Sequence, residues 1–244
     1  MNLLGQVRAL HRAWRFRLNS ERFGISFLFN RDLKGKTAVD AGANWGIYSY
    51  WMHSRVGAEG HVIAFEPQPE LSAHLRELRD SFRLRRLEIA EMGLSSQIDE
   101  LTLRRPKAHW GGATFESESE DSNYYDLIKA KVTTLDTYFE NHPARPISFI
   151  KCDVEGHEHH VFRGGQNILL EDRPDLLFEC YDAENPDCKE FSYLKSVDYE
   201  GFCFFGDGFA PISDYVSLRP RMHKKAVRDF VFVPKERARA LTNR

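Results

Sequence analysis

From residue 36 onward, short runs rich in β-branched residues alternate with segments of helical spacing, and this alternation limits the fold more than any other feature. Strands separated by helices are typical of βαβ units, which build a mostly parallel sheet with helices on both faces. We therefore predict an α/β fold with a mostly parallel sheet. Its parallel strands are predicted at 36–42, 61–67, 87–94, 147–153 and 174–180.

The C-terminal part of the chain has a different pattern. The segment "GFCFFGDGFAP" (201–211) contains Gly-Asp-Gly, which favours a hairpin turn, and "DFVFVPK" (229–235) is predicted as another strand. We therefore expect the sheet to end in an antiparallel hairpin. An extra edge strand is predicted at 99–106. The polar segment 106–127 is long for a connection, which is typical of a functional lid or a disordered loop.

The chain of 244 residues fits one α/β domain, which we place at 36–244, preceded by a helical extension over 1–35. In the extension, apolar residues recur at helical spacing with basic residues largely between them. One interpretation is an amphipathic helix packed on the domain, and another is a helix that lies on an anionic membrane surface or a partner. The apolar residues are Leu3, Leu4, Val7, Leu10 and Trp14.

Composition argues against several classes of protein. The formal net charge of -2 gives no overall field that would attract nucleic acid, so we expect no nucleic-acid partner. No uninterrupted apolar run reaches about 18 residues, so no transmembrane helix is expected. The four cysteines form no CxxC pair and are too few for a disulfide scaffold. We interpret them as reduced thiols of a cytoplasmic protein.

The segment "TAVDAGANWG" (37–46) predicts a binding loop between a strand and a helix. Asp40 lies at the end of the strand, and Gly42 lets the backbone approach a ligand closely. A second acid, Glu66, ends the next strand 20 residues after Gly46, where an acid accepts hydrogen bonds from a ribose diol. The simpler alternative is that these residues only shape a tight turn.

A nicotinamide dinucleotide is a poor match to this loop. The dinucleotide fingerprint would need glycine at 44 and 47, where the chain has Asn44 and Ile47. The pattern Asp-x-Gly-x-x-x-Gly instead resembles motif I of class I S-adenosylmethionine-dependent methyltransferases. A dehydrogenase therefore ranks behind a methyltransferase.

Longer motifs make the resemblance more specific. "VDAGANWG", "VIAFEPQPE", "TTLDTYF" and "FIKCDVEGHEHHVFRGG" occur in the order and rough spacing of the FkbM-type methyltransferase family. The similarity covers about residues 36–180, and the element Asp-Val-Glu-Gly after the Ile-Lys strand is its most diagnostic part. The resemblance implies a Rossmann-like, doubly wound, mostly parallel seven-stranded sheet, S-adenosylmethionine as methyl donor, and O-methylation of small hydroxylated metabolites or sugars.

The resemblance also assigns residues by position. Methyl transfer to a hydroxyl needs a base, and Asp153 and His157 are the predicted catalytic pair, with Glu155 third. The alternative for Glu155 is an acid that favours a helix N-terminus. The cofactor-binding residues are Asp40, Gly42, Ala43 and Asn44 in the loop, Glu66 on the ribose diol, and Glu91 and Met92 beside the adenine.

No metal site is predicted. The segment "HEHH" (157–160) lacks the histidine at 161 that a metalloprotease motif needs, because Val161 stands there. On a helix, His157 and His160 share a face and His159 points elsewhere. A minority interpretation places a divalent cation among Asp153, Glu179 and Asp182, which lie at the ends of neighbouring strands.

The sequence thus predicts an S-adenosylmethionine-dependent O-methyltransferase that acts on a small molecule or saccharide. Two alternatives stay open: an N-directed or metal-assisted methyltransferase, and a cofactor-binding module without catalysis.

Overall fold

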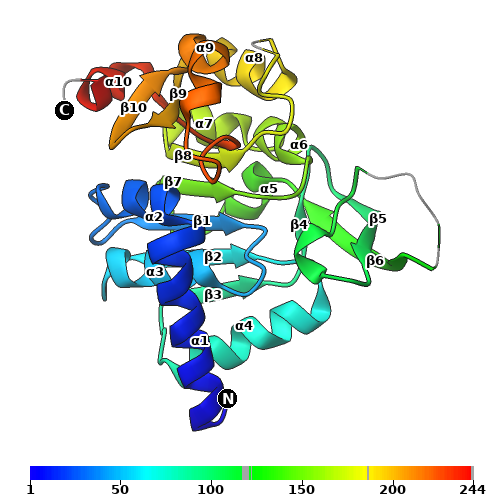
Figure 1. The fold of residues 1–244 in the computed structure, drawn as a ribbon. Helices are drawn as coiled ribbons and strands as arrows, with labels where there is room; N and C mark the ends of the chain where they lie inside the picture. The colour runs from blue at the N-terminus through cyan, green and yellow to red at the C-terminus, as the bar shows by residue number, and fades with distance from the viewer. Residues whose placement is uncertain (117–120, 122, 186, 243–244) are drawn as a thin grey trace.

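All the predicted strands except 99–106 contribute to one eight-stranded sheet (Figure 1). The structure is a computed structural model, and it describes residues 1–116, 121, 123–185 and 187–242. From one edge of the sheet to the other, the strands are β10 (Gly208–Pro211), β9 (Tyr199–Phe205), β11 (Asp229–Pro234), β8 (Asp175–Glu179), β7 (Ile147–Cys152), β1 (Thr37–Ala41), β2 (His61–Phe65) and β3 (Leu87–Ala90).

The pairing of the strands confirms the predicted fold class. β1 pairs in parallel with β2 and β7, and the outer neighbours β3 and β8 continue the parallel part. β11, β9 and β10 pair antiparallel, and β9 and β10 form the predicted hairpin. Seven strands were expected. The eighth is the short strand β10, which adds the second arm of that hairpin to the edge of the sheet.

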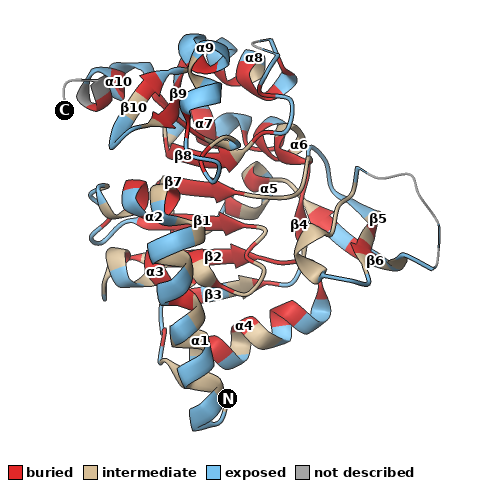
Figure 2. Ribbon diagram, in the orientation of Figure 1, coloured by how far each residue is buried: buried red, intermediate tan, exposed pale blue. Residues whose placement is uncertain are grey.

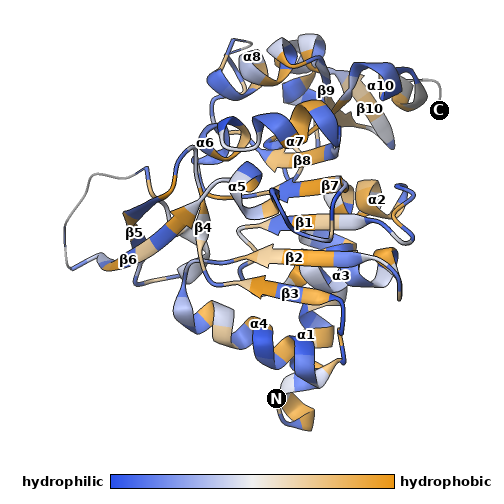
Figure 3. Cartoon of the chain, turned by 180° about the vertical axis from the view of Figure 1, so that it is seen from behind, coloured by the Kyte–Doolittle hydropathy of each residue, from blue (hydrophilic) through white to orange (hydrophobic). Residues whose placement is uncertain are grey.

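Helices cover both faces of the sheet, and the buried residues divide into two hydrophobic clusters. Figure 2 shows that the central strands are buried along most of their length, and Figure 3 shows β2, β3 and β8 coloured toward the hydrophobic end. Such strands read as continuous apolar runs because both faces are covered. One cluster includes residues of α1 (Leu3–Arg15), α2 (Arg22–Phe29), α3 (Ile47–Val56), α4 (Pro69–Ser81) and α10 (Lys235–Thr242). The other includes residues of α5 (Leu135–Phe139), α6 (Glu158–Arg163), α7 (Gln166–Glu171), α8 (Lys189–Ser196) and α9 (Tyr215–Leu218).

A second, three-stranded sheet lies beyond the carboxyl ends of the parallel strands (Figure 1). It consists of β4 (Gly93–Leu94), β6 (Tyr125–Thr133) and β5 (Asp99–Pro106). The prediction of an edge strand at 99–106 is confirmed, because β5 has these bounds and lies at one edge of the three-stranded sheet. It pairs antiparallel with β6 along its whole length and does not belong to the main sheet.

The segment 106–127 is only partly irregular. A 3-10 turn occupies Trp110–Gly112, and β6 begins at Tyr125. The indole of Trp110 stacks on that of Trp45 with ring planes 3° apart, so this part is fastened to the domain. Residues 117–120 and 122, on which the lid interpretation also rests, lie outside the described residues.

The N-terminal helix α1 packs on the domain through one side only. Ala13 is buried, and its carbonyl accepts a hydrogen bond from the Trp51 indole at 3.3 Å. The opposite side leaves Leu3 and Val7 more than half exposed. In the part of the chain that the structure describes, no helix is both long enough and apolar enough to cross a membrane.

Candidate active site

A pocket lies at the carboxyl ends of β1, β2 and β7, where the topology of the sheet reverses between β1 and β7. Open α/β sheets bind their ligands at this position. The pocket has a volume of about 480 Å³ when the open space at its mouth is included. It is lined by five of the predicted site residues, namely Gly42, Asn44, Glu66, Asp153 and Glu155.

The loop after β1 approaches the end of β7 very closely. Gly42 has φ +76°, a left-handed conformation that glycine adopts readily. A Cβ atom built on Gly42 would lie 1.9 Å from the Asp153 carbonyl oxygen, which is part of the backbone. The amides of Gly42 and Ala43 both donate to the Phe65 carbonyl at 3.0 Å, so the loop is also bound to the end of β2. Only glycine fits at position 42.

Glu66 is held at the floor of the pocket by backbone donors. The Asn44 amide donates to Oε2 of Glu66 at 2.8 Å, and the Gln68 amide donates to Oε1 at 3.0 Å. Burial of this carboxyl group, which is 2% exposed, raises its pKa to about 7 although both hydrogen bonds favour the ionised form. Glu66 therefore titrates near neutral pH.

Two residues that line the pocket have buried acceptor atoms without hydrogen-bond partners. These atoms are Oδ1 of Asn44 and Oε1 of Gln68; Oδ1 of Asp40 also lacks a partner, but Asp40 does not line the pocket. Buried acceptors usually have a donor, so the two lining atoms indicate a ligand with N–H or O–H groups. Three carboxylates line or border the cavity, and among the described lining residues there is no lysine, arginine or histidine. The site thus favours a cationic ligand over an anionic one.

Behind the pocket, a buried lysine joins the ends of β1 and β7. Lys151 Nζ donates to Oδ2 of Asp153 at 2.8 Å. Burial by itself would lower the pKa of Lys151, but the carboxylates of Asp153 and Asp40 raise it above its usual value. Asp40 is fully buried and accepts a hydrogen bond from the Ser49 hydroxyl at 2.6 Å. Lys151 therefore holds two acids of the site in place, and sequence reasoning had not assigned it a role.

The predicted catalytic residues lie in two different environments. Asp153 and Glu155 line the pocket, and Glu155 accepts a hydrogen bond from the Tyr181 hydroxyl at 2.6 Å. Burial raises the pKa of Glu155. His157 is 4% exposed and does not line the pocket. Its ring is held on both sides, with Nδ1 at 2.5 Å from Glu116 Oε1 and Nε2 at 2.9 Å from Ser95 Oγ. Burial lowers the pKa of His157, partly offset by Glu116.

The predicted adenine residues are not among those that line the pocket. Glu91 forms an exposed ion pair with Arg76 at 2.7 Å, and Met92 packs against the hydrophobic core. The next two residues, Gly93 and Leu94, line the pocket instead, because the chain turns into the second sheet there. Sequence reasoning also missed Gln68, although it lies in the segment "VIAFEPQPE", and Phe115, which comes from a segment without a recognisable motif.

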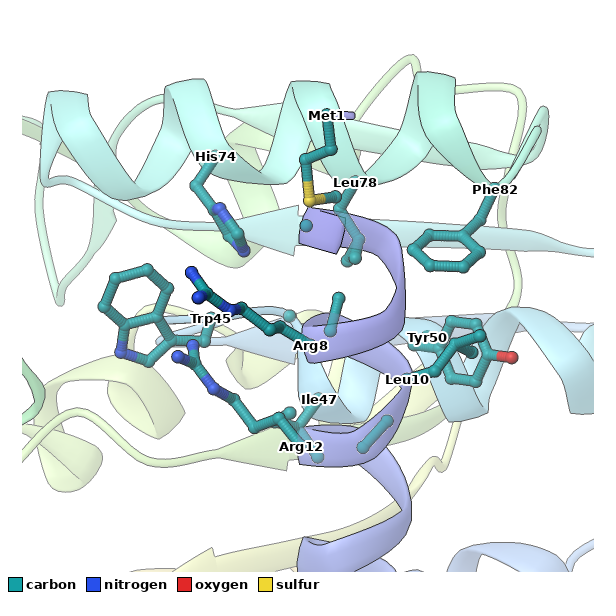
Figure 4. Close-up of a pocket in the computed structure, with 14 residues that line it drawn as sticks. Met1, Arg8, Leu10, Arg12, Trp45, Ile47, Tyr50, His74, Leu78 and Phe82 are labelled. Atoms are coloured by element: carbon teal, nitrogen blue, oxygen red, sulfur yellow. The ribbon is translucent and has the colours of Figure 1, made fainter. Parts of the chain in front are cut away.

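A larger hollow lies beside the loop but contains none of the predicted site residues (Figure 4). It has a volume of about 660 Å³ with its open mouth included and is enclosed by α1, α3 and α4. Figure 4 shows Arg8 and Arg12 pointing toward Trp45, and the Arg12 guanidinium lies 4.4 Å from the centre of its ring. Its basic rim distinguishes it from the acid-lined pocket.

Similar solved structures establish the fold. An FkbM methyltransferase from Methylobacillus flagellatus KT has a TM-score of 0.53 and 18% identity over 93% of this chain, which spans only 54% of that longer one. A Streptococcus mutans protein in complex with SAH has a TM-score of 0.51 and 12% identity, covering 88% of this chain and 96% of that one. Fibrillarin from Aeropyrum pernix, with natively bound S-adenosyl-L-methionine, has a TM-score of 0.50 and 12% identity, covering 87% and 74%. At such identities the likeness establishes the fold, which is that of S-adenosylmethionine-dependent methyltransferases.

The family follows from the sequence itself. Residues 40–200 match the model of the methyltransferase FkbM domain, which is more than half of the chain. The protein therefore belongs to the FkbM methyltransferase family, as the motifs predicted. No curated protein matches the sequence.

The residues of the pocket fit the cofactor of this class, S-adenosylmethionine. A ligand with two ribose hydroxyls, an ammonium group and an adenine amino group offers donors to the unpartnered acceptors of Asn44 and Gln68. The absence of a side chain at Gly42 leaves room for close backbone contact. The positive sulfonium suits the carboxylates of the pocket.

The cation hypothesis of the sequence has less support. Asp153, Glu179 and Asp182 do not appear among the described groups whose ligand atoms lie within 4.8 Å of one another. Asp182 is exposed. The prediction that His157 and His160 share a helix face is confirmed, because their rings stack at 4.5 Å.

Proposed function

We propose that this protein transfers the methyl group of S-adenosylmethionine to a hydroxyl of a small metabolite or saccharide. The observation that carries the proposal is the chemistry of the pocket: unpartnered acceptors and three carboxylates, with no basic side chain among the described lining residues. A cationic methyl donor is attracted there, whereas the pyrophosphate of a dinucleotide is repelled.

Each side chain of the pocket has a defined part in this proposal. Glu66 accepts hydrogen bonds from the ribose diol, and the loop at Gly42 and Asn44 supports the amino-acid end of the donor. The bound donor supplies an electrophilic methyl group. An acceptor hydroxyl beside Asp153 and Glu155 loses its proton to a carboxylate oxygen as its own oxygen forms the new C–O bond. The electron pair of the broken C–S bond stays on sulfur, so the transfer leaves S-adenosylhomocysteine.

His157 supports this arrangement from behind. Its ring contacts Phe115, which lines the pocket, at a centroid distance of 5.3 Å. Its hydrogen bonds to Glu116 and Ser95 join the wall of the pocket to the start of α6. We therefore assign proton removal to Asp153 or Glu155 and a positioning role to His157.

Calorimetric titration with S-adenosylhomocysteine, with NADH as control, tests the donor site. We expect micromolar binding of S-adenosylhomocysteine alone, and the affinity should depend on pH through Glu66. The ionised carboxylate is the better acceptor, and its pKa in the free protein is about 7. Lowering the pH from 8 to 6 protonates Glu66 and should weaken binding about tenfold, whereas raising it above 8 should change little.

The variant Glu66→Gln identifies the source of that pH dependence. It should bind S-adenosylhomocysteine more weakly at pH 8, by about 1.5–3 kcal/mol, and with an affinity that hardly changes between pH 6 and 8. The exposed acid Glu140 provides the control variant Glu140→Gln. Binding of NADH alone, or an unchanged pH profile in Glu66→Gln, would contradict the assignment.

The variant Glu155→Gln tests proton removal. It keeps the size of the side chain but removes the base, so we expect turnover with a hydroxylated acceptor to fall about 100-fold. The dissociation constant for S-adenosylhomocysteine should stay within about twofold of wild type. Asp182→Asn, at an exposed acid outside the pocket, is the control. Full turnover in Glu155→Gln would leave Asp153 as the base and reject Glu155.

A further inference from the structure

Two cysteines and a glutamate form a buried cluster outside the pocket. Cys180 follows β8 directly, Cys188 immediately precedes α8, and Glu190 lies in the first turn of that helix. The three side chains offer one sulfur or oxygen atom each, and these atoms all lie within 4.8 Å of one another. All three residues are at most 5% exposed. The cluster thus brings together the two ends of the connection between β8 and α8.

The distance between the two sulfur atoms is that of thiolates that share one metal ion. Sγ of Cys180 and Sγ of Cys188 are 3.7 Å apart. Two sulfurs on a tetrahedral zinc ion, each at about 2.3 Å from the metal, are about 3.8 Å apart. The sulfur atoms of a disulfide are about 2.05 Å apart, so Cys180 and Cys188 form no disulfide in this structure.

The carboxylate of Glu190 lacks a close cation. It accepts a hydrogen bond from the Cys180 thiol at 3.9 Å and pairs with the Lys189 ammonium group at the same distance. Lys189 is half exposed, so its charge is largely hydrated. A buried carboxylate with such distant partners is costly, and a metal ion bound beside it would remove that cost.

The fourth position of a tetrahedral ion falls to water. His159 lies on α6, which packs against α8, but it is not among the described residues whose ligand atoms lie within 4.8 Å of one another at this cluster.

We propose that Cys180, Cys188 and Glu190 bind one zinc ion that closes the loop between β8 and α8. Thiolate ligands select zinc over magnesium or calcium, and each thiol releases its proton when it binds the metal. The usual CxxC spacing is absent because a loop of seven residues separates the two cysteines. The site holds the segment that carries Tyr181, whose hydroxyl donates to Glu155. The ion is therefore structural and takes no part in methyl transfer.

Metal analysis of the full-length protein tests the proposal independently of catalysis. Protein is purified under reducing conditions without chelator, and its metal content is measured by inductively coupled plasma mass spectrometry. We expect one zinc ion per chain. Cys180→Ser and Cys188→Ser should contain less than a tenth of that amount, and Glu190→Gln should bind zinc about tenfold more weakly or worse. Cys203→Ser, at a buried cysteine elsewhere in the sheet, should keep the full amount.

A second measurement uses the unaltered protein in case a variant fails to fold. Titration of the thiols with an organomercurial should release zinc in proportion to the modified sulfur. Three results would overturn the proposal: reduced wild-type protein that takes up no zinc at micromolar concentration, a disulfide between Cys180 and Cys188, or zinc retained by the cysteine variants.

The last of these results would place the metal elsewhere. Glu116, His157 and His160 form the other described cluster with three ligand atoms within 4.8 Å, and His160→Ala would then lose the ion. If zinc binds at Cys180, Cys188 and Glu190, His160→Ala should retain the full amount of zinc. Binding of S-adenosylhomocysteine measured on the same samples shows separately whether the donor site is intact.

Discussion

Gly42→Ala should abolish measurable binding of S-adenosylhomocysteine and lower the stability of the fold. The added methyl group would lie 1.9 Å from the Asp153 carbonyl oxygen, and no rotation of a side chain can relieve a contact with backbone. The ends of β1 and β7 must therefore move apart, which displaces the loop at Asn44 and the carboxylate of Asp153 together. We expect the affinity to fall more than 100-fold, since a displacement of about 1 Å at a reacting centre already costs about that much.

Gly35→Ala is the matched control for this experiment. Gly35 has φ +73°, close to that of Gly42, but a Cβ atom there would meet no atom within 4 Å. Both variants therefore carry the same backbone strain, about 1 kcal/mol, and only one carries the clash. Thermal unfolding and calorimetry of the two proteins separate these effects. Equal behaviour of the two variants would show that close approach at Gly42 is unimportant.

Lys151→Met should destabilise the fold by about 3–5 kcal/mol, because the change removes one member of a buried ion group and leaves the others uncompensated. Lys151 is 7% exposed and donates to Asp153, and its charge also acts on Asp40, which has a buried oxygen without a partner. Methionine has a similar length and no charge. Urea denaturation of both proteins measures the loss of unfolding free energy.

The pH dependence of that loss follows from the same charges. Burial raises the pKa of Asp40, and the charge of Lys151 opposes this rise, so in the variant the pKa of folded Asp40 should lie further above its value in the unfolded chain. Stability should therefore fall as pH rises from 5 to 8 and Asp40 is forced to ionise, so the variant should be closest to wild type at pH 5. Lys129→Met, at an exposed lysine on β6, is the control and should change stability by less than about 0.5 kcal/mol. If Lys151→Met lowers the free energy of unfolding by less than about 1 kcal/mol, Lys151 does not stabilise the charges of Asp40 and Asp153.

The strands of the main sheet and the glycine loop could be predicted because each depends on a requirement that acts on a few neighbouring residues. Buried parallel strands require apolar runs, and the close approach of β1 to β7 requires glycine at 42. These features are visible in a few neighbouring residues. The same holds for Glu66, whose position at the end of β2 follows from the chain alone.

Residues brought in by tertiary structure could not be predicted in this way. Gln68 and Phe115 line the pocket, but Phe115 arrives there through the pairing of β5 with β6, which joins distant segments. Glu91 and Met92 are predicted beside the adenine from their position in the strand expected at 87–94, but β3 ends at Ala90, before the chain enters the second sheet. His157 has the residue type of a base, but its ring lies in a buried contact with Glu116 that sequence spacing does not reveal. Lys151 did leave a signal, since a lysine in a buried apolar strand requires a partner of opposite charge.

The small sheet of β4, β6 and β5 has a consequence for how specificity can change. It branches from the chain between β3 and β7 and shares no strand with the main sheet, yet Leu103 of β5 reaches the pocket. Insertions or substitutions along its hairpin would remodel the entrance while the hydrogen-bonded ladder that carries Asp40, Glu66 and Asp153 keeps its register. Recognition of the acceptor and retention of the methyl donor are thus separable traits, and selection can alter the first while it preserves the second.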